Sequence, residues 1–202
     1  MDTSLVHSLN AFLLHHDAIE DPLVAYVGAA EVLFLALLAA LFVLARGFHR
    51  PRARRGAVAA GLSAGVALAI GQVLSRLVDR PRPFVADPSG VHLFARHAAD
   101  AGFPSDHATA SFAIAVAILL RSRRWGYVAL AMAVVLSVGR VAMGVHYPSD
   151  VIAGAALGSA VALALYAPPL RRPLHALADR AGALWDGALR GVLVRLGLSG
   201  RG

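Results

Sequence analysis

Residues 23–45 read LVAYVGAAEVLFLALLAALFVLA, and Glu31 is the only charged residue among them. A helix rises about 1.5 Å per residue, so about 20 apolar residues cross the hydrocarbon core of a bilayer. This run can cross a membrane unaided. Over the whole 202-residue chain, 58% of residues are hydrophobic, which is more than soluble domains carry. The sequence therefore predicts one integral membrane domain covering residues 1–202.

Further apolar segments follow at about residues 57–77, 104–120, 125–143 and 148–167. The last three are short for a span, but polar helix ends are tolerated where they are buried around a cavity. The predicted fold class is all-α. We expect a polytopic transmembrane helical bundle over residues 23–168, with five spans, or six if the N-terminal segment also crosses.

Two amphipathic segments flank this core. Residues 1–22 contain no Lys or Arg, which argues against a signal peptide and favours a helix in the membrane interface. Residues 169–202 are predicted to form an amphipathic helix on the cytoplasmic surface. The expected apolar faces are Leu5, Leu9, Phe12 and Leu13 in the first segment, and Leu174, Leu177, Ala181, Leu184 and Leu189 in the second.

The basic residues predict the topology. All 19 are arginine: the loop after residue 45, which includes Arg46, carries five, residues 121–124 carry three, and the tail to Arg201 carries six. With five spans these groups share one side of the membrane. The positive-inside rule predicts that this is the cytoplasmic side of a bacterial inner membrane. Because the arginines follow the topology, the net charge of +7 does not indicate nucleic-acid binding. The chain has no Cys, which excludes disulfides and thiolate metal sites.

Three polar clusters fall on the opposite side, which would be the periplasm or cell exterior. They are Arg80-Pro81-Arg82-Pro83, Phe103-Pro104-Ser105-Asp106-His107, and Gly139-Arg140 followed by His146-Tyr147-Pro148-Ser149-Asp150. Ionisable residues are costly near a bilayer and usually mark function there. We expect the clusters to form one shared site.

These residue types suit phosphate chemistry. Arg82 and Arg140 offer planar guanidinium forks to phosphoryl oxygens, and Ser105 lies at a helix start where backbone amides favour an anion. Asp150 lies four residues after His146 and can orient its ring, which makes His146 a plausible nucleophile. His107 is then available as a general acid.

Simpler roles remain open. An interfacial His or Arg often snorkels or caps a helix, and Asp106 also suits the first turn of a helix. Glu31 is either functional or a structural partner for Arg76 or another cluster arginine. We expect the remaining histidines to be interfacial or loop residues: His7, His15, His16, His49, His92, His97 and His175. Four glycines at four-residue spacing are expected to serve helix packing: Gly61, Gly65, Gly154 and Gly158.

Together the clusters resemble the type 2 phosphatidic acid phosphatase (PAP2) superfamily of integral membrane lipid phosphatases. Its motifs are Lys, six residues, Arg-Pro; Pro-Ser-Gly-His; and Ser-Arg, five residues, His, three residues, Asp. The first ends here at Arg82-Pro83, the second is Pro104-Ser105-Asp106-His107, and the third runs from Gly139-Arg140 to Asp150. The three motifs occur in order between residues 75 and 150.

Three positions depart from the family pattern. The family Lys would fall at Ser75, so Arg76 or Arg80 replaces it or the contact is missing. Gly139 stands in place of Ser, and Asp106 in place of Gly. With Asp106, the second motif is similar to the branch of bacitracin-resistance-type undecaprenyl-diphosphate phosphatases.

The resemblance implies a phosphohistidine mechanism without metal or other cofactor. His146 would attack the phosphorus, Asp150 support it and His107 protonate the leaving group. The implied phosphate-site residues are Arg82, Ser105 and Arg140, with Arg76, Arg80 and Asp106 as further candidates. The expected partner is a membrane lipid phosphate, best undecaprenyl diphosphate recycled for cell-wall synthesis, or else phosphatidylglycerophosphate or phosphatidate. A non-hydrolytic lipid-binding or transport protein is the rival class, and the oligomeric state is not predicted.

Overall fold

The computed structural model describes residues 2–44 and 50–196 of the chain. Every secondary-structure element in these residues is helical, which confirms the all-α class. The helices are α1 (Asp2–Leu14), α2 (Asp17–Val43), α3 (Arg50–Val78), α4 (Pro83–Ala86), α5 (Asp106–Leu119), α6 (Arg123–Ala142), α7 (Pro148–Tyr166) and α8 (Pro168–Arg195). Three residues named above, Arg46, His49 and Arg201, lie outside the described residues, as does Ala45, the last residue of the first predicted span.

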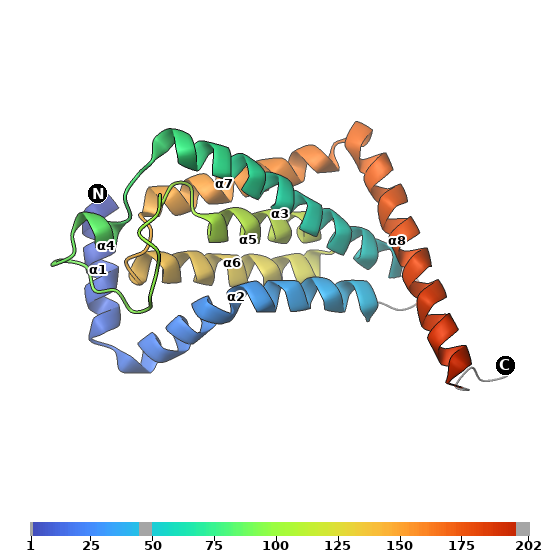
Figure 1. Cartoon of the computed structure of the whole chain (residues 1–202), viewed down its shortest axis with the longest axis horizontal. Helices are drawn as coiled ribbons and strands as arrows, with labels where there is room; N and C mark the ends of the chain where they lie inside the picture. The colour runs from blue at the N-terminus through green and yellow to red at the C-terminus, as the bar shows by residue number, and fades with distance from the viewer. Residues whose placement is uncertain (1, 45–49, 197–202) are drawn as a thin grey trace.

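Five helices, α2, α3, α5, α6 and α7, run alongside one another as a bundle (Figure 1). Four helical segments, which contain α2, α3, α6 and α7, are long and apolar enough to cross a membrane. The fifth, α5, has only 14 residues, and most of them are buried. It packs against α3, α6 and α7, so it needs little lipid-facing length. The bundle therefore agrees with five predicted spans in a multi-pass membrane protein.

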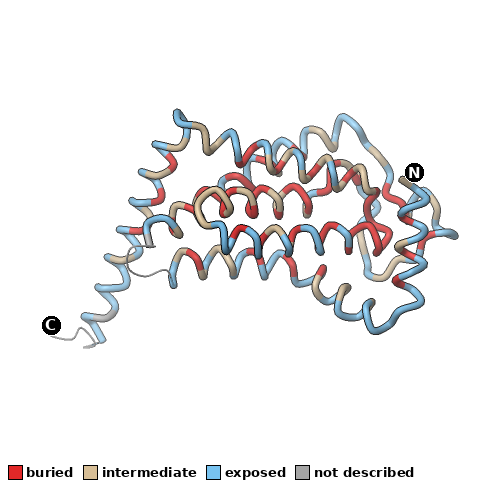
Figure 2. The backbone as a smooth tube through the Cα atoms, turned by 180° about the vertical axis from the view of Figure 1, so that it is seen from behind, coloured by how far each residue is buried: buried red, intermediate tan, exposed pale blue. Residues whose placement is uncertain are grey.

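The two ends of the bundle differ. Helices α1 and α4 and the loop after α4 lie at one end, and α8 lies at the other (Figure 1). The polar clusters belong to the first end, whereas Arg121, in the connection between α5 and α6, and Arg123 and Arg124, which begin α6, lie at the second. Figure 2 shows buried residues along the inner faces of the bundle. Its outer faces expose large apolar side chains, including Val32, Leu35, Val73, Leu77, Ile152 and Leu163.

Close packing of α5 on α7 fixes the centre of the bundle. A Cβ atom at Gly154 would come within 2.6 Å of the Ser105 carbonyl oxygen, and one at Gly158 would overlap the backbone of Thr109. These two glycines therefore serve helix packing, as predicted. The same prediction is wrong for Gly61 and Gly65 on α3, because a Cβ at either would meet nothing within 4 Å.

The N-terminal helix is shorter than the predicted segment 1–22. It ends at Leu14, where the imidazoles of His15 and His16 bond to the carbonyls of Ala11 and Phe12 one turn earlier, both at 2.6 Å. Residues 17–22 begin α2 instead.

Helix α1 packs against the protein on one side and leaves part of its predicted apolar face exposed. Val6, Asn10 and Leu13 are buried, while Leu5 and Phe12 are exposed. Asn10 donates to the carbonyls of His92 and Ala142, both at 2.9 Å. Helix α1 is therefore bonded to the loop after α4 and to the end of α6. Its position in a membrane interface stays a prediction.

The tail helix α8 docks on α3 through two ion pairs. Arg54 donates two hydrogen bonds to Asp186, at 2.9 and 2.8 Å, and Arg55 pairs with Asp179. The buried face contains Leu174, Ala178 and Gly182. From the expected apolar face, Leu177, Leu184 and Leu189 remain exposed, and a cytoplasmic membrane surface stays the predicted environment for them.

Candidate active site

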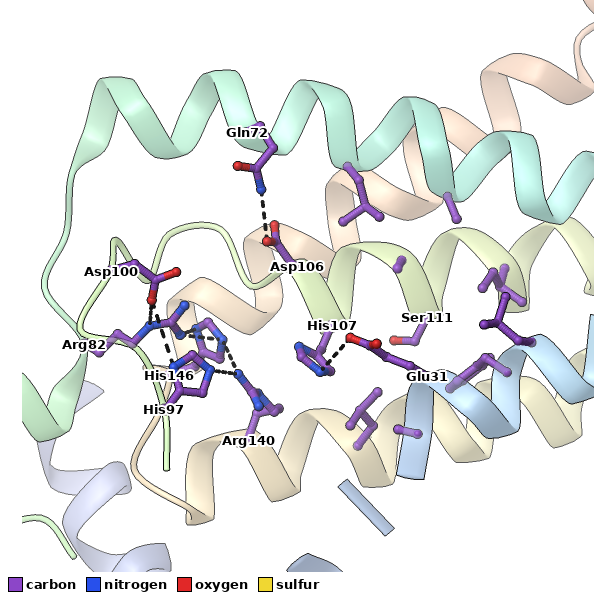
Figure 3. Close-up of a pocket in the computed structure, with 18 residues that line it drawn as sticks. Glu31, Gln72, Arg82, His97, Asp100, Asp106, His107, Ser111, Arg140 and His146 are labelled. Atoms are coloured by element: carbon purple, nitrogen blue, oxygen red, sulfur yellow. Dashed lines mark hydrogen bonds and ion pairs between the residues drawn. The ribbon is translucent and has the colours of Figure 1, made fainter. Parts of the chain in front are cut away.

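A cavity of about 550 Å³ lies beside the polar clusters, lined by residues of α2, α3, α5 and α6 and of the neighbouring loops. Arg82, His107, Arg140 and His146 all line it, which brings the three predicted clusters together. Figure 3 shows their side chains converging. Deeper in the bundle the lining is apolar and includes Phe34, Leu68, Ile114 and Leu136. The cavity thus joins a charged end to an apolar one.

His146 is held in one orientation. It lies in the short connection between α6 and α7, where Gly144 takes a φ of +74° that suits glycine. The His146 Nδ1 atom is 2.9 Å from the Gly102 carbonyl oxygen. A carbonyl can only accept a hydrogen bond, so Nδ1 carries the proton, and Nε2 is the unprotonated nitrogen with a lone pair. His146 is buried, and its Nε2 faces the cavity arginines.

Two guanidinium groups flank that lone pair. The Nε2 atom of His146 is 3.0 Å from Nη1 of Arg82 and 3.3 Å from Nη2 of Arg140. Arg82 is fixed by bonds from its Nε to Asp100 at 2.9 Å and from its Nη1 to the Val145 carbonyl at 3.0 Å. The Nε of Arg140 is buried and has no hydrogen-bond partner among the described residues. Buried donors are normally paired, so this atom is free for a ligand oxygen.

Asp150 lies behind His146, at the start of α7. It is fully buried, and its two oxygens accept from Nη1 of Arg80 and from the Tyr147 amide, both at 2.8 Å. The distance from its Oδ2 to His146 Nδ1 is 3.7 Å. Asp150 is therefore close enough to compensate a positive charge on His146, and its predicted supporting role in catalysis stays a prediction. The ring tautomer is set by the hydrogen bond that His146 Nδ1 donates to the Gly102 carbonyl, which the sequence did not indicate.

His107 lies in the first turn of α5 and points into the cavity (Figure 3). Its Nε2 is 3.6 Å from Oε1 of Glu31 on α2. The expected structural partner of Glu31 was Arg76 or a cluster arginine, and the structure places the carboxylate beside His107 instead.

Three of the predicted phosphate-site residues do not line the cavity. Ser105 is buried at the start of α5, where its Oγ accepts from the Ala108 amide at 3.5 Å. Arg80 bonds to Ser149 and Asp150 and lies over the Tyr147 ring, 4.0 Å from its centroid. Arg76 is exposed on α3. The structure thus separates Ser105, Arg76 and Arg80 from Arg82 and Arg140.

Asp106 does line the cavity, and its Oδ2 accepts a hydrogen bond from Gln72 at 3.0 Å. An ionised carboxylate repels a phosphoryl group, so its charge opposes the phosphate-binding role predicted for it. Asp106 and Gln72 instead form a hydrogen-bonded polar pair between α5 and α3.

The loop after α4 contributes two residues that sequence reasoning missed. His97 does lie in a loop, as expected, but its Nε2 is 2.7 Å from Nη2 of Arg140. Asp100 bonds to Arg82. Each loop residue thus holds one of the two cavity arginines. A His and an Asp three residues apart, shortly before the second motif, were the available signal.

Burial and charge determine the protonation of the loop residues. Burial lowers the pKa of His146 to about 4, with Arg140 and Arg82 adding to the effect and Asp150 opposing it. Burial and the same two arginines also lower the pKa of His97. Burial alone would raise the pKa of Asp100, but the hydrogen bond and the positive charge of Arg82 outweigh it, so the pKa is lowered. At neutral pH both imidazoles are neutral and Asp100 is ionised.

Within residues 2–44 and 50–196, no group of three or more His, Cys, Asp or Glu side chains is arranged to hold a metal ion. The positive charge that lines the cavity comes from Arg82 and Arg140. The predicted independence from metal is left to experiment.

Comparison with known proteins identifies relatives of the chain. The family model of the PAP2 superfamily matches residues 56–172, a range that includes all the cavity residues outside α2. The chain is 33% identical over 140 residues to "Undecaprenyl-diphosphatase BcrC" of Bacillus subtilis, covering 69% of this chain and 70% of that protein. It is 41% identical over 133 residues to "Decaprenylphosphoryl-5-phosphoribose phosphatase" of Mycobacterium tuberculosis, covering 64% of this chain and 66% of that protein.

The fold also has solved counterparts. The crystal structure of Aquifex aeolicus LpxE superposes with a TM-score of 0.62 at 22% identity. The likeness covers 81% of this chain and 93% of that one. At 22% identity, this similarity shows a shared fold and no more.

Proposed function

Because the chain belongs to the PAP2 superfamily and is a membrane lipid phosphatase, we propose that it removes the terminal phosphate of a polyprenyl diphosphate through a phosphohistidine on His146. The observation that carries this proposal is the placement of His146 Nε2, an unprotonated nitrogen whose lone pair accepts hydrogen bonds from Arg82 and Arg140. A nucleophile needs that lone pair, and a phosphoryl group needs those two cations.

In the first step, His146 Nε2 attacks phosphorus and a P–N bond forms while the P–O bond to the lipid breaks. His107 gives its proton to the departing oxygen. The phosphorylated ring of His146 is cationic, and Asp150 at 3.7 Å compensates that charge. In the second step, water attacks phosphorus, the P–N bond to His146 breaks, and His107 takes up a proton from the attacking water. Inorganic phosphate leaves, and His146 and His107 return to their starting forms.

Arg82 and Arg140 act on the phosphoryl oxygens in both steps. Their guanidinium forks match the geometry of these oxygens, and their positions are fixed by Asp100 and His97 before substrate binds. Such preorganised donors stabilise charge that builds up in the transition state. Arg140 Nε, buried without a partner among the described residues, is a ready donor for an oxygen of the substrate.

The apolar depth of the cavity suits the lipid chain. Phe34 and Leu68, on α2 and α3, line it beyond the charged end. A substrate whose phosphate lies at Arg82 would place its first chain carbons along these side chains. Burial of that chain from water would contribute affinity without selecting one particular lipid.

Similarity to BcrC supports undecaprenyl diphosphate as the substrate, with a role in cell-wall synthesis and bacitracin resistance. The positive-inside distribution of arginine supports a site on the periplasmic or exterior face of the inner membrane. Phosphatidylglycerophosphate and phosphatidate are further glycerolipid candidates of the same chemistry.

A second candidate substrate class is favoured by the polar middle of the cavity. Glu31, Gln72 and Asp106 line it between the arginines and the apolar depth. Carboxylates and amides accept hydrogen bonds from hydroxyl groups, which a phosphorylated sugar carries. The relative from Mycobacterium tuberculosis acts, by its name, on a decaprenyl lipid with a phosphoribose unit.

The test is phosphate release by the detergent-purified protein in the presence of EDTA. The substrates are undecaprenyl diphosphate, decaprenylphosphoryl-5-phosphoribose, phosphatidylglycerophosphate and phosphatidate, each with His146→Ala as the control. Fastest release from undecaprenyl diphosphate, abolished in the variant, is expected. A faster rate on the ribose lipid would replace the substrate and keep the mechanism. Release that survives the variant, or that EDTA abolishes, would contradict the mechanism.

A further inference from the structure

We propose that Glu31 is a positioning residue that holds and charge-balances the proton donor His107. The inference rests on the proposed function, and it adds a residue from α2, which carries none of the three motifs. Glu31 is the only charged residue between positions 22 and 44 of the sequence. A carboxylate in a membrane-spanning helix is costly and is a functional candidate by default.

The geometry pairs Glu31 with His107. Glu31 Oε1 is 3.6 Å from His107 Nε2, and both side chains line the cavity. Figure 3 shows Glu31 reaching from α2 to the imidazole, which comes from α5. The distance is slightly longer than a hydrogen bond, so the contact is electrostatic.

The charges around His107 explain why it needs this partner. As an acid, His107 must carry a proton in a cavity that already contains the cations Arg82 and Arg140. The other two cavity carboxylates are directed at other groups: Asp100 bonds to the cation Arg82, and Asp106 accepts a hydrogen bond from the neutral amide of Gln72. Glu31 is the carboxylate that faces the imidazole, so it supplies the compensating negative charge.

A purely structural role does not account for Glu31. Its side chain is 79% exposed, so it fills no space in the core. Replacing it by Gln keeps its size and removes its charge, which leaves the fold intact and isolates the electrostatic role.

The experiment compares two leaving groups. A long-chain alkyl monophosphate expels an alkoxide that needs the proton of His107, whereas p-nitrophenyl phosphate expels a stable phenolate. General acids contribute about 10²–10⁴-fold to a rate. Glu31→Gln is therefore expected to lower kcat on the alkyl phosphate about tenfold or more, and on p-nitrophenyl phosphate less than about threefold. The matched control is Glu20→Gln, the other glutamate of the chain, which does not line the cavity.

A double-mutant cycle completes the test. Once His107→Ala has removed the acid, adding Glu31→Gln should cause no further loss. Equal losses on both substrates, an effect no larger than that of Glu20→Gln, or a loss that persists in the His107→Ala background would each overturn the proposal. Failure of the proposed function would appear separately, as phosphate release that survives His146→Ala.

Discussion

At the scale of single residues, the protonation of His146 links its position to its reactivity. Its pKa is lowered to about 4 by burial and by the nearby arginines, against an ordinary value of 6.5. The nucleophilic neutral form is therefore present above about pH 4 and is lost as the pH falls through that value. We predict that the acid limb of kcat/KM, corrected for titration of the substrate, lies near pH 4. A limb near pH 6.5 would mean that the ring is not buried as described.

Asp150 is predicted to matter for stability as well as for turnover. It is fully buried and accepts from Arg80 and the Tyr147 amide. Arg80 keeps Ser149 and Asp2 when Asp150 is removed, but the buried Tyr147 amide loses its acceptor, which costs about 1–3 kcal/mol. Asp150→Ala should therefore lower both kcat and the thermal midpoint in detergent, whereas the exposed Asp106→Ala should leave the midpoint within a few degrees of wild type. Equal midpoints for the two variants would contradict this role.

At the scale of helices, the contact between α5 and α7 supports the site, because it joins the start of α5 to the start of α7: the Ser105 amide donates to the Asp150 carbonyl at 3.1 Å. Gly158→Ala would push a Cβ into the Thr109 backbone, and overpacking of this kind costs about 1–3 kcal/mol. Gly61→Ala is the matched control, since a Cβ there meets nothing within 4 Å and Ala favours a helix. We predict a lower thermal midpoint for the first variant only. A drop of the same size in both would show that the two helices do not pack this closely.

The helices also show what sequence could and could not predict. Apolar length predicts the bundle helices, although the segment that forms α5 is too short to be predicted as a span by length alone. The convergence of Arg82, His107, Arg140 and His146 follows from counting five such segments. The packing role predicted for Gly61 is wrong because sequence spacing identifies a small residue but not whether a neighbouring helix faces it.

Contacts between distant parts of the chain also could not be predicted from the sequence. The Gly102 carbonyl that fixes the tautomer of His146 has no side chain to mark it, and the partners of Glu31 and His97 lie on other segments. The first motif makes Arg80 a candidate phosphate-binding residue. In the structure it pairs with buried Asp150 instead and does not line the cavity. Sequence spacing records local order, whereas these contacts depend on tertiary packing.

At the scale of the whole molecule, the arginine distribution predicts that the cavity end of the bundle faces away from the cytoplasm. The chain has no native Cys, so single cysteines can report the topology directly. Ser89→Cys, in the exposed loop after α4, should react with a membrane-impermeant maleimide added to intact spheroplasts. Ala183→Cys, exposed on α8, should react only after permeabilisation. The reverse pattern would invert the topology.

The measurement that tests the central claim most directly is capture of the phosphoenzyme. The protein is mixed with substrate labelled in its terminal phosphate, quenched in base during turnover, and digested for mass spectrometry. We predict an acid-labile, base-stable phosphohistidine on the peptide that contains His146, and none in His146→Ala. Label on another side chain, or full turnover without any label at His146, would contradict the account.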